Sequence, residues 1–61
     1  MFSQVYNPEQ QLIAEIERKE LEARDTRRRV EHAQSEQDKR VLNRQLTDLE
    51  REIEVLRERL G

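Results

Sequence analysis

The chain has no cysteine and only one histidine, one glycine and one proline among its 61 residues. Without cysteine it cannot form a disulfide, and one histidine supplies too few of the usual ligands for a structural metal site. A chain this short also has little interior in which to enclose a core of its own. Association with other helices is the remaining way to stabilise it.

Aromatic residues make up only 3% of the chain. No apolar run approaches the roughly 18 residues that a membrane-spanning helix needs. The first six residues lack the basic start and long apolar centre of a signal peptide, so a cytoplasmic location is the default expectation. No sign of charge dominates, because 12 Lys and Arg are interspersed with 14 Asp and Glu for a net charge of -2. This balance offers no general attraction to nucleic acid or to anionic lipid.

What the chain does have is the composition of long helices and coiled coils, with 43% charged and 33% hydrophobic residues. Asn7 and Pro8 form a helix start, since Asn caps free backbone N–H groups and Pro has a preset φ for the first helical position. No Gly or Pro follows until Gly61, which lies where a C-terminal cap is expected. The sequence therefore predicts an all-α protein that is helical from about residue 8 to residue 60.

The C-terminal half carries the strongest periodic pattern, a stripe of leucine and isoleucine at steps of four, three, four, three and four. Its members are Leu42, Leu46, Leu49, Ile53, Leu56 and Leu60. Such a leucine-zipper-like seam enters holes on a facing helix in a coiled coil. These six residues are the predicted oligomer interface, with a parallel homodimer as the expected assembly.

The N-terminal part offers a second candidate surface. Residues 1–7 form an apolar arm with Phe2, Val5 and Tyr6, and Leu12 and Ile16 continue an apolar stripe into the first helical turns. We expect these five residues to pack locally or to bind another protein.

A single heptad register does not run the whole chain, since it breaks near residues 31–40. One interpretation is a continuous helix whose C-terminal seam self-associates. The other is an antiparallel helical hairpin with a turn near residues 33–36, in which Ser35 caps a second helix, Ile16 faces Ile53 and Leu12 faces Leu56. Because residues 32–35 contain no Gly, Pro or Asn, the continuous helix is the leading expectation.

Catalysis is not expected, because a coiled coil offers no water-excluding pocket that could hold catalytic groups in place. No catalytic residue, cofactor, metal or small-molecule substrate is predicted. The cluster from Arg24 to Arg29 lies upstream of the leucine seam, as a basic region does in zipper proteins that bind DNA. The spacing differs from theirs, however, and acidic residues interrupt the basic surface, so nucleic-acid binding is the weakest of the alternatives.

The function expected from these patterns is protein binding. The leading hypothesis is a homo-oligomerising coiled coil with an assembly, scaffolding or adaptor role, which binds itself and a second protein. The alternatives are a small hairpin regulator that binds a larger enzyme or polymerase, and nucleic-acid binding through the Arg24 to Arg29 cluster.

Overall fold

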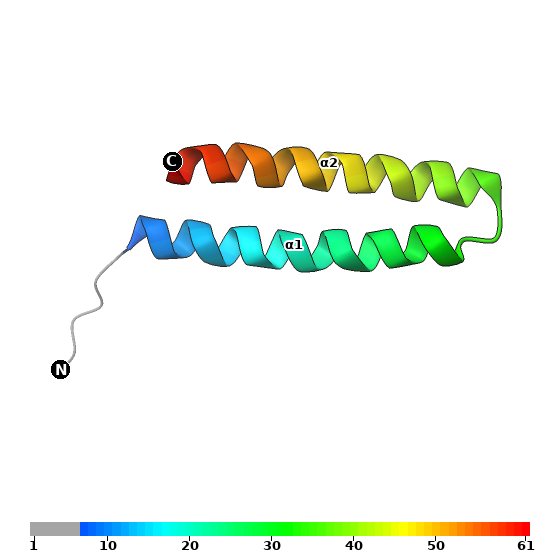
Figure 1. The fold of residues 1–61 in the computed structure, drawn as a ribbon, viewed down its shortest axis with the longest axis horizontal. Coiled ribbons are helices and arrows are strands. Elements are labelled where there is room, and N and C mark those ends of the chain that lie inside the picture. The colour runs from blue at the N-terminus through cyan, green and yellow to red at the C-terminus, as the bar shows by residue number, and fades with distance from the viewer. Residues whose placement is uncertain (1–6) are drawn as a thin grey trace.

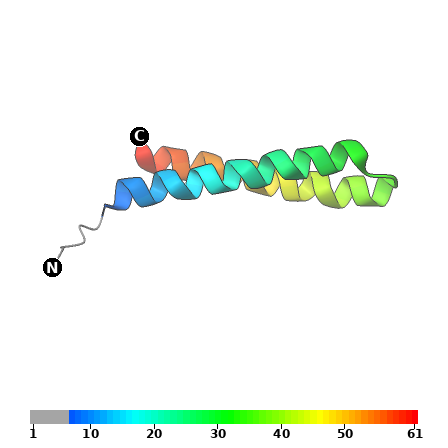
Figure 2. The same cartoon turned by 90° about the horizontal axis from the view of Figure 1, so that it is seen from below.

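The computed structural model describes residues 7–61 as two helices that pack side by side in opposite directions (Figures 1 and 2). Helix α1 spans Pro8–His32 and helix α2 spans Glu36–Leu60. There is no strand in this part of the chain. The start of α1 and the C-terminus of α2 lie at the same end of the hairpin (Figure 1).

Helix α1 begins as the sequence predicts. The side-chain oxygen of Asn7 accepts hydrogen bonds from the backbone N–H groups of Glu9 at 3.1 Å and Gln10 at 3.3 Å. Pro8 occupies the first turn, where a missing N–H costs nothing. Glu9 in the first turn and Arg29 in the last complement the helix dipole.

The turn is built without glycine. Ala33 leaves the helix in an extended conformation, with φ -66° and ψ 136°, while its N–H donates to the carbonyl oxygen of Val30 at 3.3 Å. Ser35 is also extended, and its Oγ accepts a hydrogen bond from the Asp38 N–H at 3.0 Å. No non-glycine residue in the described range has a positive φ, so ordinary side chains make this turn. The continuous helix over residues 8–60 is therefore wrong, and the antiparallel hairpin with a turn near residues 33–36 is confirmed.

The pattern of burial explains why the chain reverses. Side chains that are buried or half-buried recur at steps of three and four on both helices. They are Leu12, Ile16, Lys19, Ala23, Thr26, Val30 and Ala33 in the first half, and Lys39, Leu42, Leu46, Leu49, Ile53 and Leu56 in the second. We call these two sets the α1 stripe and the α2 stripe.

The two stripes are out of phase. If the α1 stripe continued along one helix past Ala33, it would next reach Gln37 and Arg40, which are exposed, whereas the α2 stripe starts at Lys39. One residue of offset turns a stripe by about 100° around a helix. A straight helix would thus direct its two halves toward different sides, and a break between them allows both stripes to meet.

Where the stripes meet lies the core. Ile16, Ala23, Ile53 and Leu56 are buried, and the partly buried Leu12, Leu46 and Leu49 pack against them. The four residues expected to meet in the hairpin, Leu12, Ile16, Ile53 and Leu56, all belong to this cluster.

Removal of the Ser35 cap should change the free energy of unfolding in opposite directions in a hairpin and in a continuous helix. In the hairpin, Ser35→Ala removes the acceptor for the Asp38 N–H and should lower the free energy of unfolding by about 1 kcal/mol. Ser35→Asp keeps an acceptor and should stay close to the original chain. In a continuous helix, by contrast, alanine at an interior position would stabilise. Urea unfolding followed by circular dichroism measures the difference, and a stabilising Ser35→Ala would contradict the hairpin.

Candidate protein-binding surfaces

The C-terminal leucines face their own chain. Of the six residues predicted as an oligomer interface, Ile53 and Leu56 are buried against α1, and Leu42, Leu46 and Leu49 are half-buried. Only Leu60 counts as exposed, with 38% of its surface accessible. The stripe expected to bind a second copy thus contacts α1, and its binding of a second chain stays a prediction.

The structure describes two of the five candidate partner-binding residues in the N-terminal part. Leu12 and Ile16 belong to the hairpin core. Phe2, Val5 and Tyr6 lie outside the described residues. Within the described residues, the surface that is open to a partner therefore lies on the sides of the hairpin.

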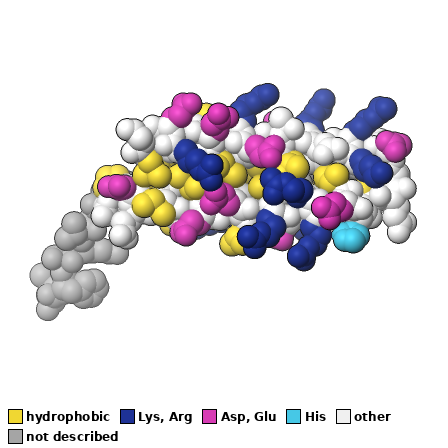
Figure 3. Space-filling model, viewed as in Figure 1, with side chains coloured by type: hydrophobic (Ala, Val, Ile, Leu, Met, Phe, Trp, Pro, Cys, Tyr) yellow, Lys and Arg dark blue, Asp and Glu magenta, His cyan; other side chains and the backbone are white. Residues whose placement is uncertain are grey.

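The core is thin because α1 contributes small or polar side chains to it. Ala23 and Thr26 are buried in the α1 stripe, and the Thr26 hydroxyl donates to the carbonyl oxygen of Glu22 at 2.8 Å. Helix α2 presents leucines and isoleucine instead. No side chain in the described residues is completely enclosed. Hydrophobic side chains are visible between the two helices from outside (Figure 3), so this contact leaves apolar surface uncovered.

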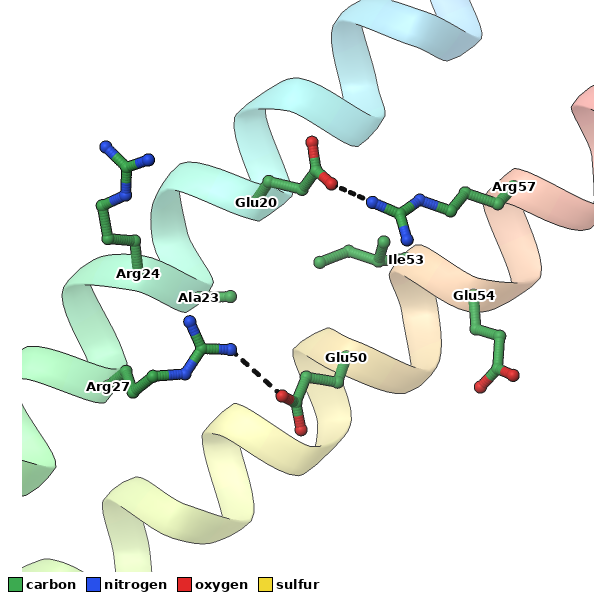
Figure 4. Close-up of a pocket in the computed structure, with 8 residues that line it drawn as sticks. All are labelled: Glu20, Ala23, Arg24, Arg27, Glu50, Ile53, Glu54 and Arg57. Atoms are coloured by element: carbon green, nitrogen blue, oxygen red, sulfur yellow. Dashed lines mark hydrogen bonds and ion pairs between the residues drawn. The ribbon is translucent and has the colours of Figure 1, made fainter.

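On one side of the two stripes there is a hollow with an ion pair at each end. Figure 4 shows the residues that line it. Arg57 pairs with Glu20, and Arg27 Nη2 lies 3.2 Å from Glu50 Oε2. Ala23 and Ile53 lie between the two pairs (Figure 4), and the small Ala23 side chain leaves a hollow there. We call this side the Ala23 face. The hollow measures ≈ 580 Å³ and is lined by Glu20, Ala23, Arg24, Arg27, Glu50, Ile53, Glu54 and Arg57.

The charges around the hollow on the Ala23 face balance, because its lining contains three Arg and three Glu. The other side of the stripes, which we call the Thr26 face, is different. Its first hollow measures ≈ 390 Å³ and is lined by Glu22, Asp25, Thr26, Arg29, Gln45, Asp48, Leu49 and Glu52. Four acidic side chains against one Arg make this hollow acidic.

A second hollow of ≈ 430 Å³ adjoins the acidic one and shares Asp48 and Glu52 with it. Its lining adds Val55, which is 46% exposed, the buried Leu56 and three basic residues, Lys19, Arg51 and Arg59. Apolar atoms provide most of the surface in this second hollow. The Thr26 face therefore combines an acidic part with a largely apolar part whose charged residues are mostly basic.

Lys19 lies at the edge of the Thr26 face. Its position belongs to the α1 stripe, and its ammonium reaches out to Glu52, with 2.6 Å between Nζ and Oε2. The hydrogen bond to Glu52 raises the pKa of Lys19 above its ordinary value of 10.5, against a smaller opposing effect of desolvation. A raised lysine pKa stabilises the fold below the unfolded-state pKa, and this contribution is lost as pH rises through the folded-state pKa. The pair therefore contributes at neutral pH and is lost above about pH 10.5.

The structure divides the Arg24 to Arg29 cluster between the two faces. Arg24 and Arg27 line the Ala23 face, and Arg27 is paired with Glu50. Asp25 and Arg29 line the acidic hollow on the opposite side. The cluster therefore presents no single basic surface to a row of phosphates.

Sequence reasoning missed two members of the α1 stripe, Lys19 and Thr26. The signal was present, since they continue the steps of four and three from Leu12 and Ile16 to Val30. Lys and Thr at these positions made the stripe look thin.

Comparisons with protein-family models, curated proteins and solved structures find no match to this chain. Within residues 7–61, neither helix is long and apolar enough to cross a membrane. The same residues contain no group of three or more His, Cys, Asp or Glu side chains placed to hold a metal ion.

The Lys19 pair can be tested by titration. Glu52→Gln removes the charge and weakens the hydrogen bond, so the pKa of Lys19 should fall toward 10.5. Glu50→Gln is the matched control, because Glu50 pairs with Arg27 instead. NMR of the lysine ammonium groups across alkaline pH measures the pKa of Lys19 directly. An equal fall in both variants would refute a specific pair between Lys19 and Glu52.

Proposed function

We propose that this protein is a non-catalytic binding module whose Thr26 face takes up an amphipathic helix of another protein. The bound helix would complete a three-helix arrangement. Such a module acts as an adaptor or as a regulator of the larger protein that carries the third helix. The observation that carries the proposal is the pair of adjoining hollows on this face, one acidic and the other largely apolar.

The unequal sizes of the two stripes support this role. Helix α2 directs leucines toward a partner stripe that supplies only Ala23 and Thr26 in its middle, so Leu49 remains half-buried. A half-exposed apolar side chain gains free energy on further burial, about 25 cal/mol for each Å² removed from water. Leu49 and Val55, which line the two hollows, are the side chains that a third helix would cover.

The charge of the face indicates the chemistry of the partner. Glu22, Asp25 and Asp48 line the acidic hollow on both helices. A helix with Lys or Arg beside its apolar stripe would place opposite charges near these carboxylates, whereas an acidic helix would be repelled. The contribution of such exposed charges falls with added salt, because the Debye length is only about 8 Å at physiological ionic strength. We therefore expect as the ligand an amphipathic helix that carries Lys or Arg where it covers the acidic hollow.

Self-association through the C-terminal leucines is a weaker candidate for the hairpin. Ile53 and Leu56 are already buried against α1. A second copy could reach them only if the two helices separated, and this would cost the intramolecular contacts that the core now makes. A helix that adds to the outside of the hairpin keeps those contacts.

Two designed peptides test the proposal. Both have leucine at steps of three and four, and they differ only in carrying Lys or Glu beside the leucines of the half that would cover the acidic hollow. We expect the Lys peptide to bind with a Kd on the order of micromolar, about tenfold or more tighter than the Glu peptide. Calorimetric titration at low and at physiological salt measures both affinities. Equal affinity for the two peptides, or no binding of the Lys peptide, would contradict this function.

Two exposed positions provide a matched pair of variants. Val55→Glu places a charge in the apolar hollow of the Thr26 face and should weaken binding of the Lys peptide by about tenfold. Leu21→Glu adds the same charge at a position outside this face and should leave the affinity unchanged. Both side chains are exposed in the free hairpin, so the circular dichroism of both variants should match the original chain. A similar loss in the two variants would show that the Thr26 face is not the binding site.

A further inference from the structure

Leu21 is the most exposed large apolar side chain in the described residues, with 60% of its surface accessible. It does not belong to the α1 stripe, and it lines neither hollow of the Thr26 face. It lines instead a small hollow with Glu17, Glu20 and Arg24. Two of these residues, Glu20 and Arg24, also line the larger hollow over Ala23 and Ile53. A projecting side chain and a hollow thus lie next to each other on the Ala23 face.

A projection beside a hollow is what a two-fold symmetric contact requires, because each copy supplies both parts. We propose that a second copy of this chain docks on the Ala23 face, with the two α1 helices antiparallel. In this dimer the Leu21 side chain of each copy enters the other copy's hollow over Ala23 and Ile53. The hollow of ≈ 580 Å³ has room for a leucine side chain. The small size of Ala23, which is buried against α2, leaves this room over Ile53.

The charges beside Leu21 favour this occupant and this orientation. Glu17 lies four residues before Leu21 and Arg24 lies three residues after it. With the two-fold axis placed between Glu20 and Leu21 of the antiparallel α1 helices, Glu17 of one copy lies opposite Arg24 of the other, and the pair forms twice. A parallel arrangement would oppose Glu17 to Glu17. Among the described residues, neither Glu17 nor Arg24 takes part in an ion pair within the chain.

This contact extends the function proposed above. The Ala23 face and the Thr26 face lie on opposite sides of the stripes and share no lining residue in their main hollows. A dimer formed through the Ala23 face would therefore leave both Thr26 faces open. The assembly would be a bivalent module that brings two partner helices together.

Sedimentation equilibrium of the full chain, at concentrations up to several hundred micromolar, tests the contact. We expect a monomer–dimer equilibrium for the original chain. Leu21→Asp should be monomeric at every concentration while keeping its circular dichroism, since Leu21 makes no core contact. Val55→Asp is the control on the other side of the stripes and should dimerise normally. A monomeric original chain would overturn the proposal. A dimer that survives Leu21→Asp would also overturn it and would point to the C-terminal leucines as the interface.

Exchange of the two charges tests the orientation. Glu17→Arg alone and Arg24→Glu alone should each weaken dimerisation by about tenfold, since each variant opposes two pairs of like charges. The double variant Glu17→Arg/Arg24→Glu restores both attractions and should recover the original dimerisation constant. Recovery in the double variant supports the antiparallel contact. Failure to recover, with circular dichroism unchanged, would overturn it.

Discussion

The contact between the α1 stripe and the α2 stripe depends on the reversal of the chain at residues 33–35. Each stripe alone is the apolar edge of a helix and would remain in water without a partner. Because the stripes differ in phase, no straight helix could direct both toward one neighbour along its whole length. The turn removes this conflict. Its extended residues interrupt the helix at the point where the phase of the stripe changes. The Ser35 side chain accepts a hydrogen bond from a backbone N–H that the start of α2 would otherwise leave free.

The unequal composition of the two stripes determines what the surface can do. A hairpin with leucine at every stripe position would bury its contact more completely and leave little for a partner. Here Ala23 and Thr26 lie across from larger side chains, and hollows remain on both sides of them. The charges around the hollow on the Ala23 face balance. On the Thr26 face the first hollow is acidic, and the charged residues of the second are mostly basic. The same small residues thus produce two surfaces with different electrostatic character.

Several features of the fold can be predicted from the sequence because they depend on local chemistry. The Asn7 cap, the Ser35 cap and the spacing of the C-terminal leucines each follow from residue types within one or two turns. The choice between a long helix and a hairpin did not follow from such local patterns. The absence of Gly and Pro near residue 34 favoured a continuous helix, yet Ala33 and Ser35 adopt extended conformations that are open to any side chain.

The binding surfaces were harder to predict, because they depend on which stripe residues meet across the turn. A Lys at position 19 indicates a solvated position when it is considered alone. In the hairpin its stem lies in the α1 stripe, and its ammonium reaches Glu52 on the other helix. The Arg24 to Arg29 cluster likewise appears continuous along the chain, but it covers more than one turn of helix. Its members therefore point to opposite sides.

The ion pairs between the helices contribute to register more than to stability. Each pair has at least one solvent-exposed partner, and such surface pairs contribute only about 0–1 kcal/mol. On the Ala23 face, however, the pairs Glu20–Arg57 and Arg27–Glu50 discriminate between alignments. Sliding α2 by one heptad would keep apolar residues in contact but would oppose Glu20 to Glu50 in one direction and Arg27 to Arg57 in the other. Both slips replace an attraction by a repulsion. The charges thus keep Ala23 beside Ile53, and this alignment places the hollow next to Leu21.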